Sequence, residues 1–360
     1  MVKHKQWVAD VTRFRGEKTT RHGKLRLDKN ERVTPFPAEF LAEVQALVTS
    51  DALAAYPETE QLYEALANLH GLSIEHFVLT AGSDGAIRHC FDLFVQPGDG
   101  VVVLDPTFAM IDVYCGLFKA NRTPVGYNQA LELDTEKFFT AIDERTTLVV
   151  IANPNSPTGT LIEEEKLVKI LEHAQKHNTA VLVDEAYFGF CPYTAIPLIN
   201  KFSNLIVSRT FSKTYGLAGI RVGYLVANPE IAGLLYKFKP MYEVNSIGVL
   251  AALYAMRNSD RIEAYLASAN AGYKYLVEEL DRRGIAHTST CTNFLHIDFG
   301  ANKEKASSEF SKRNILVRGG LNIPTFENFL RISTGPIESM ISVIEVIDFI
   351  LSKGAEHVQS

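Results

Sequence analysis

The sequence has few cysteines and a single tryptophan, and its cysteines follow no pattern. The four cysteines, Cys90, Cys115, Cys191 and Cys291, are scattered along 360 residues and lack the spacing of metal ligands. We interpret all four as buried packing thiols of a reduced, cytoplasmic protein. The sequence therefore gives no sign of a metal site or of a disulfide framework.

Long hydrophobic runs and an excess of basic residues are also missing. No apolar run approaches the ~20 residues that span a bilayer. The polar segment Met1–Asp10 lacks the apolar core of a secretory signal. The net charge is −6, with no dense basic block. These absences argue against a membrane partner and against a nucleic-acid partner.

The middle of the chain alternates short apolar strands with amphipathic helices. The predicted strands are Phe77–Thr80, Val101–Leu104, Thr147–Ile151, Ala180–Val183, Leu205–Ser208 and Tyr224–Ala227. This alternation predicts an α/β domain whose mostly parallel sheet lies between helices. Ligands of such sheets bind beyond the carboxyl ends of the strands. The residues that follow each strand are therefore the candidates for a site.

After about Met241 the pattern changes to long helices and short strands. Helices are predicted at 247–257, 261–283, 303–313 and 337–352, and strands at 293–299, 315–318 and 330–333. This order predicts a smaller α+β domain. We expect residues 1–50 to form an N-terminal arm that packs with this small domain, 51–245 to form the large domain, and 246–360 to form connecting helices and the small domain.

Small and polar residues follow several of the predicted strands. The segment Thr80–Gly85 opens a helix, whose free N–H groups can hold an anion. The loop Asn153–Gly159 contains two prolines and a glycine, which make it rigid. Asp184 ends a third strand, and a carboxylate beside a buried strand usually has a cationic partner. Each feature alone also fits a simple turn or a helix cap.

The last group surrounds a lysine. Thr210, Ser212 and Arg221 carry the donor groups of a phosphate-binding cup, and Lys213 lies within it. Neighbouring positive charge disfavours the ammonium form of a lysine and favours the nucleophilic amine. A surface lysine is the alternative interpretation of Lys213.

Taken in order, these motifs resemble the fold-type I enzymes that depend on pyridoxal 5'-phosphate (PLP), and among them the class I and II aminotransferases. The resemblance runs from about Leu27 to the C-terminus and is strongest to the histidinol-phosphate aminotransferase branch. The motifs that carry it are Leu27-Asp28-Lys29-Asn30-Glu31, Tyr56-Pro57-Glu58, Asn153–Gly159, Asp184-Glu185-Ala186-Tyr187, Arg209–Lys213 and Leu330-Arg331-Ile332-Ser333. It implies a sheet of the seven-stranded type, a PLP cofactor and a homodimer with shared active sites.

The resemblance also implies a role for each matching residue. Lys213 would bind PLP covalently and then act as the general base, Asp184 would pair with the ring nitrogen, and Tyr187 would contact the ring's phenolic oxygen. The other implied cofactor contacts are Gly82, Ser83, Asp84, Phe108, Asn155, Ser156, Thr210, Ser212, Arg221 and, from the neighbouring subunit, Tyr56. Arg331 would clamp the substrate carboxylate, and Arg318 would lie near a substrate phosphate or carboxylate.

The chain departs from the family pattern at two places. Ser156 stands where the branch usually has an asparagine, so the contact to the ring oxygen falls to Ser156 or to the neighbouring Asn155. Residues 12–17 lack the tyrosine-and-proline motif by which the branch reaches its substrate. The arginines around this arm suit a phosphorylated or otherwise anionic substrate.

We therefore predict an aminotransferase that moves an amino group, by a ping-pong mechanism, from L-glutamate to a keto acid or a phosphorylated ketone. A PLP-dependent decarboxylase of a phospho-amino acid is an alternative on the same fold, because sequence does not fix how the substrate lies over the ring. A non-catalytic ligand-sensing domain is a third possibility, although no helix-turn-helix segment is visible.

Overall fold

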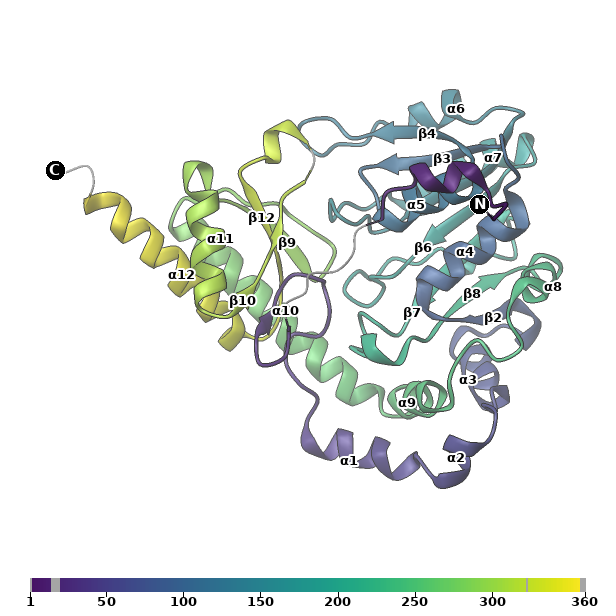
Figure 1. Ribbon diagram of the computed structural model, residues 1–360, viewed down its shortest axis with the longest axis horizontal. Coiled ribbons are helices and arrows are strands. Elements are labelled where there is room, and N and C mark those ends of the chain that lie inside the picture. The colour runs from purple at the N-terminus through teal and green to yellow at the C-terminus, as the bar shows by residue number, and fades with distance from the viewer. Residues whose placement is uncertain (1, 14–19, 322, 357–360) are drawn as a thin grey trace.

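The computed structural model describes residues 2–13, 20–321 and 323–356, and it places a smaller α+β part beside a large α/β part (Figure 1). The helices are α1 (Ala38–Leu47), α2 (Ser50–Ala54), α3 (Glu60–His70), α4 (Gly82–Phe94), α5 (Ala109–Phe118), α6 (Glu136–Ala141), α7 (Glu164–Lys176), α8 (Pro229–Phe238), α9 (Ser246–Arg257), α10 (Ser259–Arg282), α11 (Lys303–Lys312) and α12 (Ile337–Glu356). The strands are β1 (Leu25–Arg26), β2 (Phe77–Thr80), β3 (Gly100–Asp105), β4 (Asn121–Gly126), β5 (Thr146–Ala152), β6 (Ala180–Asp184), β7 (Leu205–Thr210), β8 (Gly223–Ala227), β9 (Phe294–Asp298), β10 (Ile315–Leu316), β11 (Arg318–Gly319) and β12 (Phe329–Ser333).

The large sheet has seven strands in the order β2-β8-β7-β6-β5-β3-β4. Strands β3 to β7 are parallel, and β8 runs antiparallel to both of its neighbours. This confirms the predicted mostly parallel sheet. Strand β4 is not among the predicted strands, because it lies at the edge and carries Arg122 and Pro124 instead of an apolar run.

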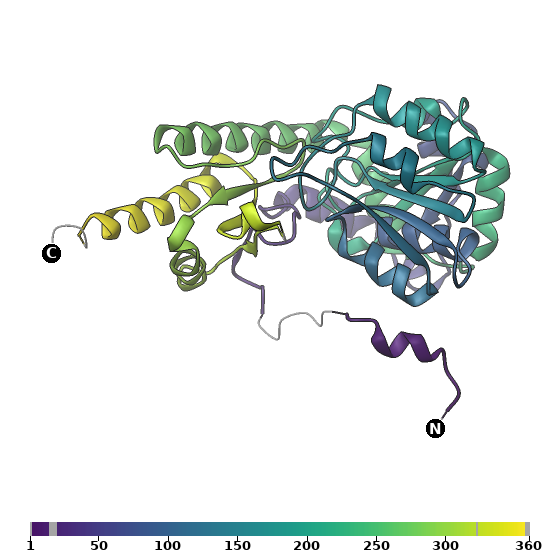
Figure 2. The same cartoon turned by 90° about the horizontal axis from the view of Figure 1, so that it is seen from above.

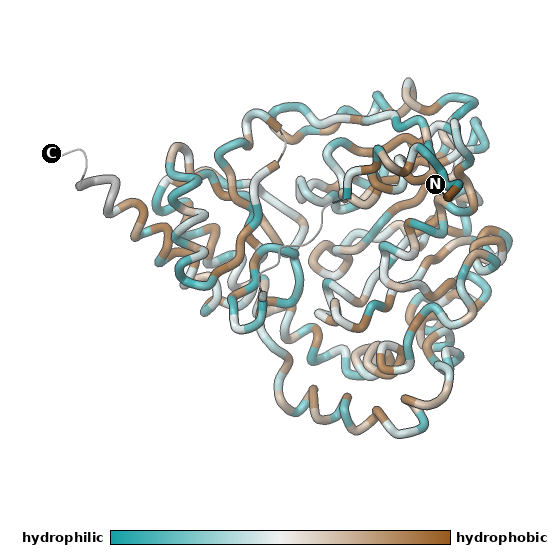
Figure 3. The backbone as a smooth tube through the Cα atoms, viewed as in Figure 1, coloured by the Kyte–Doolittle hydropathy of each residue, from teal (hydrophilic) through white to brown (hydrophobic). Residues whose placement is uncertain are grey.

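Alternate residues of the central strands face opposite sides of the large sheet. Val149, Val181 and Val207 lie in the apolar layer that contains residues of α3, α7 and α9. Leu182 and Ile206 lie in the other layer, with residues of α4, α5 and α8. Figure 2 shows the sheet between these helices, and Figure 3 shows hydrophobic stretches along its strands. Both faces are therefore covered, as a parallel sheet requires.

The small part is built on the antiparallel sheet β11-β12-β9. Its core joins Leu295 and Ile297 of β9 to apolar residues of α10, α11 and α12. The single strand predicted over 315–318 is wrong: β10 pairs with β1, whereas β11 pairs with β12. The ladder breaks at Val317 because the chain changes its pairing partner there.

The N-terminal residues contact both parts of the molecule. Strand β1 pairs in parallel with β10 of the small part. The 3-10 helix η1 (Gln6–Asp10) lies against α5, where the Trp7 Nε1–H donates to the Leu117 carbonyl at 3.1 Å. The segment of residues 12–17, where the sequence departs from the family pattern, is described only in part, because residues 14–17 lie outside the described residues. The division of the chain at residues 50 and 245 stays a prediction.

Two smaller expectations concern thiols and membrane spans. Cys90, Cys115 and Cys191 are buried, as predicted, but Cys291 is half-buried, so the prediction is wrong for that residue. Cys291 belongs to a loop that lines a cleft of about 470 Å³ beside Gly159. Across the described ranges, no helix is long and apolar enough to cross a membrane.

Candidate active site

The predicted site residues gather beyond the carboxyl edge of the large sheet. Asp184 ends β6, Thr210 ends β7, and the loop that carries Asn155 follows β5. These three strands are parallel neighbours, so their carboxyl ends open onto the same region. Strand β2 ends at Thr80, and the helix that follows it, α4, begins at Gly82.

Asp184 is a buried carboxylate held by a cross-strand neighbour. Asp184 and Ser208 are register partners in β6 and β7, and the Ser208 hydroxyl donates to Asp184 Oδ1 at 2.5 Å. Burial raises the pKa of Asp184 from 3.8 to about 6, although the Ser208 hydrogen bond acts in the opposite direction. Within the described chain, no basic side chain forms an ion pair with it. The position therefore suits a ligand that brings its own positive charge.

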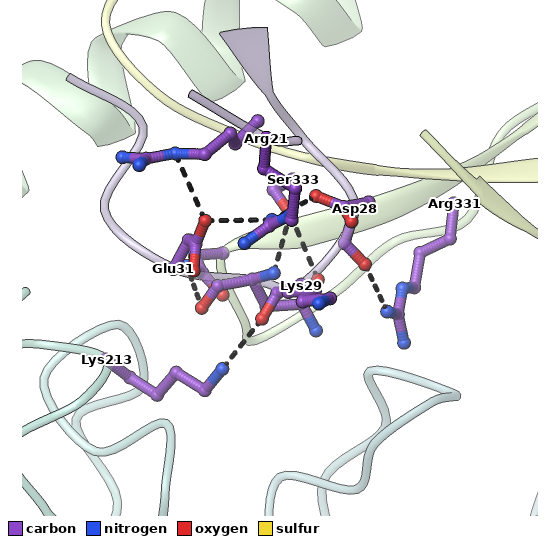
Figure 4. A network of polar contacts seen from close by, with 10 residues as sticks. Arg21, Asp28, Lys29, Glu31, Lys213, Arg331 and Ser333 are labelled. Carbon is purple, nitrogen blue, oxygen red and sulfur yellow. Dashed lines mark hydrogen bonds and ion pairs between the residues drawn. The ribbon is translucent and has the colours of Figure 1, made fainter. Parts of the chain in front are cut away.

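Tyr187 and Lys213 face the segment Asp28–Asn30 from the large domain. The Asn30 side-chain amide donates to the Tyr187 hydroxyl at 2.8 Å. The Lys213 Nζ donates to the Lys29 carbonyl at 2.9 Å and lies 5.7 Å from the centre of the Tyr187 ring. Figure 4 shows Lys213 reaching this segment from one side and Arg331 from the other.

The predicted phosphate cup is assembled by short polar contacts. The Thr210 hydroxyl donates to Ser212 Oγ at 2.9 Å, and Arg221 Nη1 donates to the same oxygen at 3.2 Å. Arg221 Nη2 reaches the Ala81 carbonyl at 3.2 Å, at the start of α4. Gly82 has a φ of 76°, and a Cβ there would lie 2.7 Å from Arg221 Nη2. Only glycine leaves room for this arginine against the helix N-terminus.

Ser83 and Asp84, the other predicted residues at this helix end, are both half-buried. The Asp84 carboxylate accepts a hydrogen bond from the Tyr114 hydroxyl at 2.9 Å. Its side chain is therefore engaged with α5, which leaves the backbone N–H as the group that an anion would meet.

Phe108 and Asn155 differ in how far neighbours engage them. Phe108 is half-buried and packs against the α4 and α5 layer. The buried Asn155 amide donates to the Pro106 carbonyl at 2.9 Å and to Thr158 Oγ1 at 2.8 Å. Ser156 is half-buried, and its hydroxyl bonds to no residue in the described ranges. Of the two candidates for the ring oxygen, Ser156 is therefore the one with an uncommitted donor.

Two arginines lie directly opposite each other in the small sheet. Arg318 of β11 is the register partner of Arg331 of β12, and Arg331 is in turn the register partner of His296 of β9. Arg331 Nη2 donates to the Asp28 carbonyl at 2.9 Å, while its buried Nε has no partner in the described chain. Burial lowers the pKa of Arg331, and the charge of Arg318 acts in the same direction. Arg318 and Arg331 therefore place two positive charges where an anion would stabilise them.

His296 was not predicted from the sequence. It is fully buried, and its Nε2 lies 2.8 Å from the Pro157 carbonyl, next to Ser156. Burial lowers the pKa of His296 to about 4, so the ring is neutral near pH 7 and Nε2–H donates. This histidine joins the small sheet to the loop that follows β5. Its only sequence signal is a polar residue inside an apolar strand, Phe294–Asp298.

Tyr56 lies apart from these residues on the surface of the chain. It is 71% exposed, and its ring stacks on that of Tyr242 with centroids 3.9 Å apart. Within one chain it therefore does not join Lys213 and Asp184.

The residues present fit PLP on three observations. Asp184 is a buried carboxylate with a raised pKa, which a protonated ring nitrogen would match. Gly82 and Arg221 form a cradle that a Cβ would fill, at a helix N-terminus suited to phosphate. Lys213 Nζ lies 5.7 Å from the centre of the Tyr187 ring, and its amine is the group that would hold the aldehyde of PLP.

Comparison with known proteins points to the same class. A model of the aminotransferase class I and II family matches residues 22–347. A histidinol-phosphate aminotransferase of Thermoanaerobacter sp. is 35% identical over 323 residues, which cover 88% of this chain and 90% of the relative. One of Symbiobacterium thermophilum is 31% identical over 354 residues, covering 96% and 95%. The crystal structure of histidinol-phosphate aminotransferase from Sinorhizobium meliloti in complex with pyridoxal-5'-phosphate superposes with a TM-score of 0.81 at 25% identity, covering 91% of both chains.

The chain belongs to the class I and II aminotransferases, and it is a PLP-dependent transaminase of fold type I. Within that family it is similar to the histidinol-phosphate aminotransferases. Both levels of the resemblance seen in the sequence are thereby confirmed.

Proposed function

We propose that the enzyme transfers an amino group between L-glutamate and a phosphorylated ketone, the ketone being the one that corresponds to histidinol phosphate. The observation that carries this proposal is the opposed pair Arg318 and Arg331. Like charges directly opposite each other across two strands destabilise a sheet, and the buried Nε of Arg331 has no partner among the described residues, so an anionic group of the substrate would satisfy it. A carboxylate and a phosphate ester both supply that anion, and the names of the relatives favour the second for the acceptor.

We propose the roles that the family resemblance implies for the residues around the cofactor. PLP, when bound, supplies an electron sink for negative charge at the substrate Cα. Asp184 keeps the ring nitrogen protonated, and Tyr187 donates to the phenolic oxygen. Lys213 holds the cofactor and then, as the general base, takes the Cα proton and later returns it. The Lys213 Nζ also donates to the Lys29 carbonyl at 2.9 Å.

The remaining contacts fix the orientation of the cofactor. Thr210, Ser212, Arg221 and the first N–H groups of α4, from Gly82 to Asp84, hold the phosphate. Phe108 stacks on the ring, and Ser156 donates to the phenolic oxygen in place of the family asparagine. Asn155 supports the loop through its bonds to Pro106 and Thr158.

The active sites are shared across a homodimer in this proposal. Tyr56 and Tyr242 are 71% and 47% exposed, which is unusual for large aromatic residues. Further apolar residues, Leu41, Leu47, Leu53 and Met241, are exposed on neighbouring elements. A second copy of the chain would cover them and would bring its Tyr56 to the phosphate cup. We also expect the enzyme to work in a reducing, cytoplasmic environment.

The experiment that tests the reaction is a half-reaction without an acceptor. PLP-loaded protein is mixed with L-glutamate, and the visible band of the cofactor is followed together with 2-oxoglutarate. We expect the band to be lost and 2-oxoglutarate to be released in equal amounts, and Lys213→Ala to abolish both. A persistent band would reject glutamate as the donor.

The acceptor is tested in the reverse direction. L-histidinol phosphate should transfer its amino group to PLP and so convert the cofactor to its aminated form, whereas dephosphorylated histidinol should do so far less efficiently. Equal efficiency would reject a phosphorylated substrate. Release of carbon dioxide from a phospho-amino acid, without formation of a keto product, would support the decarboxylase instead.

A further inference from the structure

We propose that Asn30 is a positioning residue that forces the Tyr187 hydroxyl to donate its proton to the cofactor. This inference rests on the proposed contact between Tyr187 and the phenolic oxygen. Asn30 is 2% exposed, and its Nδ2 donates to the Tyr187 hydroxyl oxygen at 2.8 Å. It comes from the N-terminal segment, far from Tyr187 in sequence.

The orientation of the Asn30 amide is determined by Ser333. The Ser333 hydroxyl oxygen accepts the Asn30 backbone N–H at 2.9 Å, and the same hydroxyl lies 3.1 Å from Asn30 Oδ1. Its single proton is satisfied only if Oδ1 accepts it, because Ser333 is fully buried and contacts no other acceptor among the described residues. With Oδ1 facing Ser333, the amide nitrogen must face Tyr187.

The direction of this hydrogen bond decides what Tyr187 can do. A tyrosine hydroxyl has one proton to give, and Asn30 occupies its oxygen as an acceptor. No described residue accepts the Tyr187 proton. That proton is therefore left for a ligand, and a phenolic oxygen that carries negative charge is the matching acceptor.

The backbone around Asn30 brings this contact together with two other site residues. The Asp28 carbonyl accepts from Arg331, and the Lys29 carbonyl accepts from Lys213, both at 2.9 Å (Figure 4). Arg21 stabilises this segment by two ion pairs, from its Nη2 to Asp28 Oδ1 at 2.5 Å and to Glu31 Oε1 at 2.9 Å. Three consecutive residues thus contact three predicted site residues from different elements.

Asparagine suits position 30 for a second reason. Its φ is 55°, in the left-handed region that asparagine and aspartate tolerate better than most residues.

The test is a spectroscopic pH titration of the PLP-loaded enzyme, made for Asn30→Asp, Asn30→Ala and Tyr187→Phe and for each Asn30 change combined with Tyr187→Phe. The cofactor dissociation constant is measured for each variant. A hydrogen bond from Tyr187 to the ionised phenolic oxygen favours the deprotonated form of the cofactor. Loss of this hydrogen bond should therefore raise the titration midpoint, which is the pH at which half of the spectral change has occurred. Asn178→Asp is the matched control, because Asn178 has the same φ of 55° but is exposed between α7 and β6.

We expect Asn30→Asp to raise the midpoint by about one unit or more, since its carboxylate takes the Tyr187 proton. Asn30→Ala should raise it less, because the hydroxyl becomes free to turn. Neither change should shift the midpoint further in the Tyr187→Phe background. Asn178→Asp should leave the titration unchanged.

The outcomes separate this inference from the proposal on which it rests. If Tyr187→Phe itself leaves the midpoint unchanged, the proposed role of Tyr187 fails. If Tyr187→Phe shifts the midpoint but Asn30→Ala and Asn30→Asp do not, only the Asn30 inference fails. If the shift caused by Asn30→Asp persists in the Tyr187→Phe background, the new carboxylate acts directly on the cofactor. That result would overturn the proposal that residue 30 acts through Tyr187. Asn30→Ala keeps the test decisive if the aspartate variant fails to fold.

Discussion

At the scale of single residues, the site combines buried charges that lack full compensation within the chain. Among the described residues, Asp184 has a hydroxyl partner but no ion-pair partner, and Arg331 has a carbonyl partner at Nη2 but none at its buried Nε. Such groups reduce the stability of a folded protein. A ligand of opposite charge would satisfy them, so substitutions at these residues are sensitive tests of the proposed function.

The first residue-scale prediction concerns the pH dependence of Asp184. Its pKa of about 6 exceeds the ordinary value of 3.8, so the folded chain binds this proton more tightly than the unfolded chain does. Its contribution therefore lowers the free energy of unfolding as the pH rises from about 4 to 6. In cofactor-free protein, Asp184→Asn should match the wild type near pH 4 and exceed it in stability above pH 6, as measured by urea unfolding.

Asp184→Asn should also reduce the turnover of the PLP-loaded enzyme by about 100-fold or more, because the protonated ring nitrogen would lose its carboxylate partner. Asp92→Asn, at a partly exposed helical ion pair with Arg88, is the control and should alter neither the pH slope nor turnover. Parallel stability curves for wild type and Asp184→Asn would contradict the raised pKa.

The second residue-scale prediction concerns Arg331. Arg331→Lys keeps the charge but loses the planar fork that matches a carboxylate. The KM for L-glutamate should rise about 10- to 100-fold, while the dissociation constant of PLP should hardly change. Arg282→Lys, in a surface pair with Glu279, should leave both values unaltered. Equal losses of substrate and cofactor affinity would rule out the clamp.

At the scale of elements, the strand β9 couples the small sheet to the loop after β5. The coupling consists of the hydrogen bond from His296 Nε2 to the Pro157 carbonyl at 2.8 Å. His296 lies beside Arg331 in the register of β9 and β12. This buried contact, together with the hydrogen bond from the Cys291 N–H to the Gly159 carbonyl at 3.1 Å, fixes the position of Arg331 relative to the loop that carries Ser156.

The element-scale prediction compares two buried histidines. Burial lowers the pKa of both His296 and His70 to about 4, so the unfolded chain binds more protons between pH 4 and 6.5. Each residue therefore reduces stability as the pH falls through that window, and His296→Leu and His70→Leu should both weaken this dependence. Only His296→Leu should also raise the KM for substrate, by about 5-fold, through loss of one hydrogen bond.

His70 is the control because it bonds Tyr224 at 3.0 Å, outside the site. The measurements are urea unfolding at several pH values and steady-state kinetics at pH 7. An unchanged KM in His296→Leu would show that the Pro157 contact serves stability alone.

At the scale of the whole molecule, the decisive question is whether two chains complete one site. Tyr56 lies on the surface of its own chain, stacked on Tyr242. A shared site requires that Tyr56 of one subunit serve Lys213 of the other. Isologous dimers of this kind allow defective subunits to complement each other.

The whole-molecule prediction is therefore a subunit-mixing experiment. Lys213→Ala and Tyr56→Phe homodimers are unfolded together, refolded with PLP and assayed. A mixed dimer contains one intact site, so random pairing of equal amounts should give about a quarter of wild-type activity, in addition to about a quarter of the activity of the Tyr56→Phe homodimer. Refolding each variant alone is the control. No gain on mixing would reject the shared site.

The sequence by itself determined much of the large domain. Six predicted strands lie where the structure has β2, β3, β5, β6, β7 and β8, because central strands of a covered sheet must be apolar throughout. The family, the cofactor and the fold also followed from ordered motifs at the strand ends. Edge strand β4 did not, since an edge position tolerates Arg122 and Pro124.

Only the tertiary structure decided how distant segments meet at the site. The sequence marks Asn30 as part of a motif, but its partners Tyr187 and Ser333 are remote along the chain. His296 likewise gains its meaning from the Pro157 carbonyl and from its place beside Arg331. Local patterns reflect burial and backbone preference, whereas these contacts depend on the packing of the small sheet and the N-terminal segment against the large domain. That packing sets the direction of each hydrogen bond, and with it the chemistry available to each side chain.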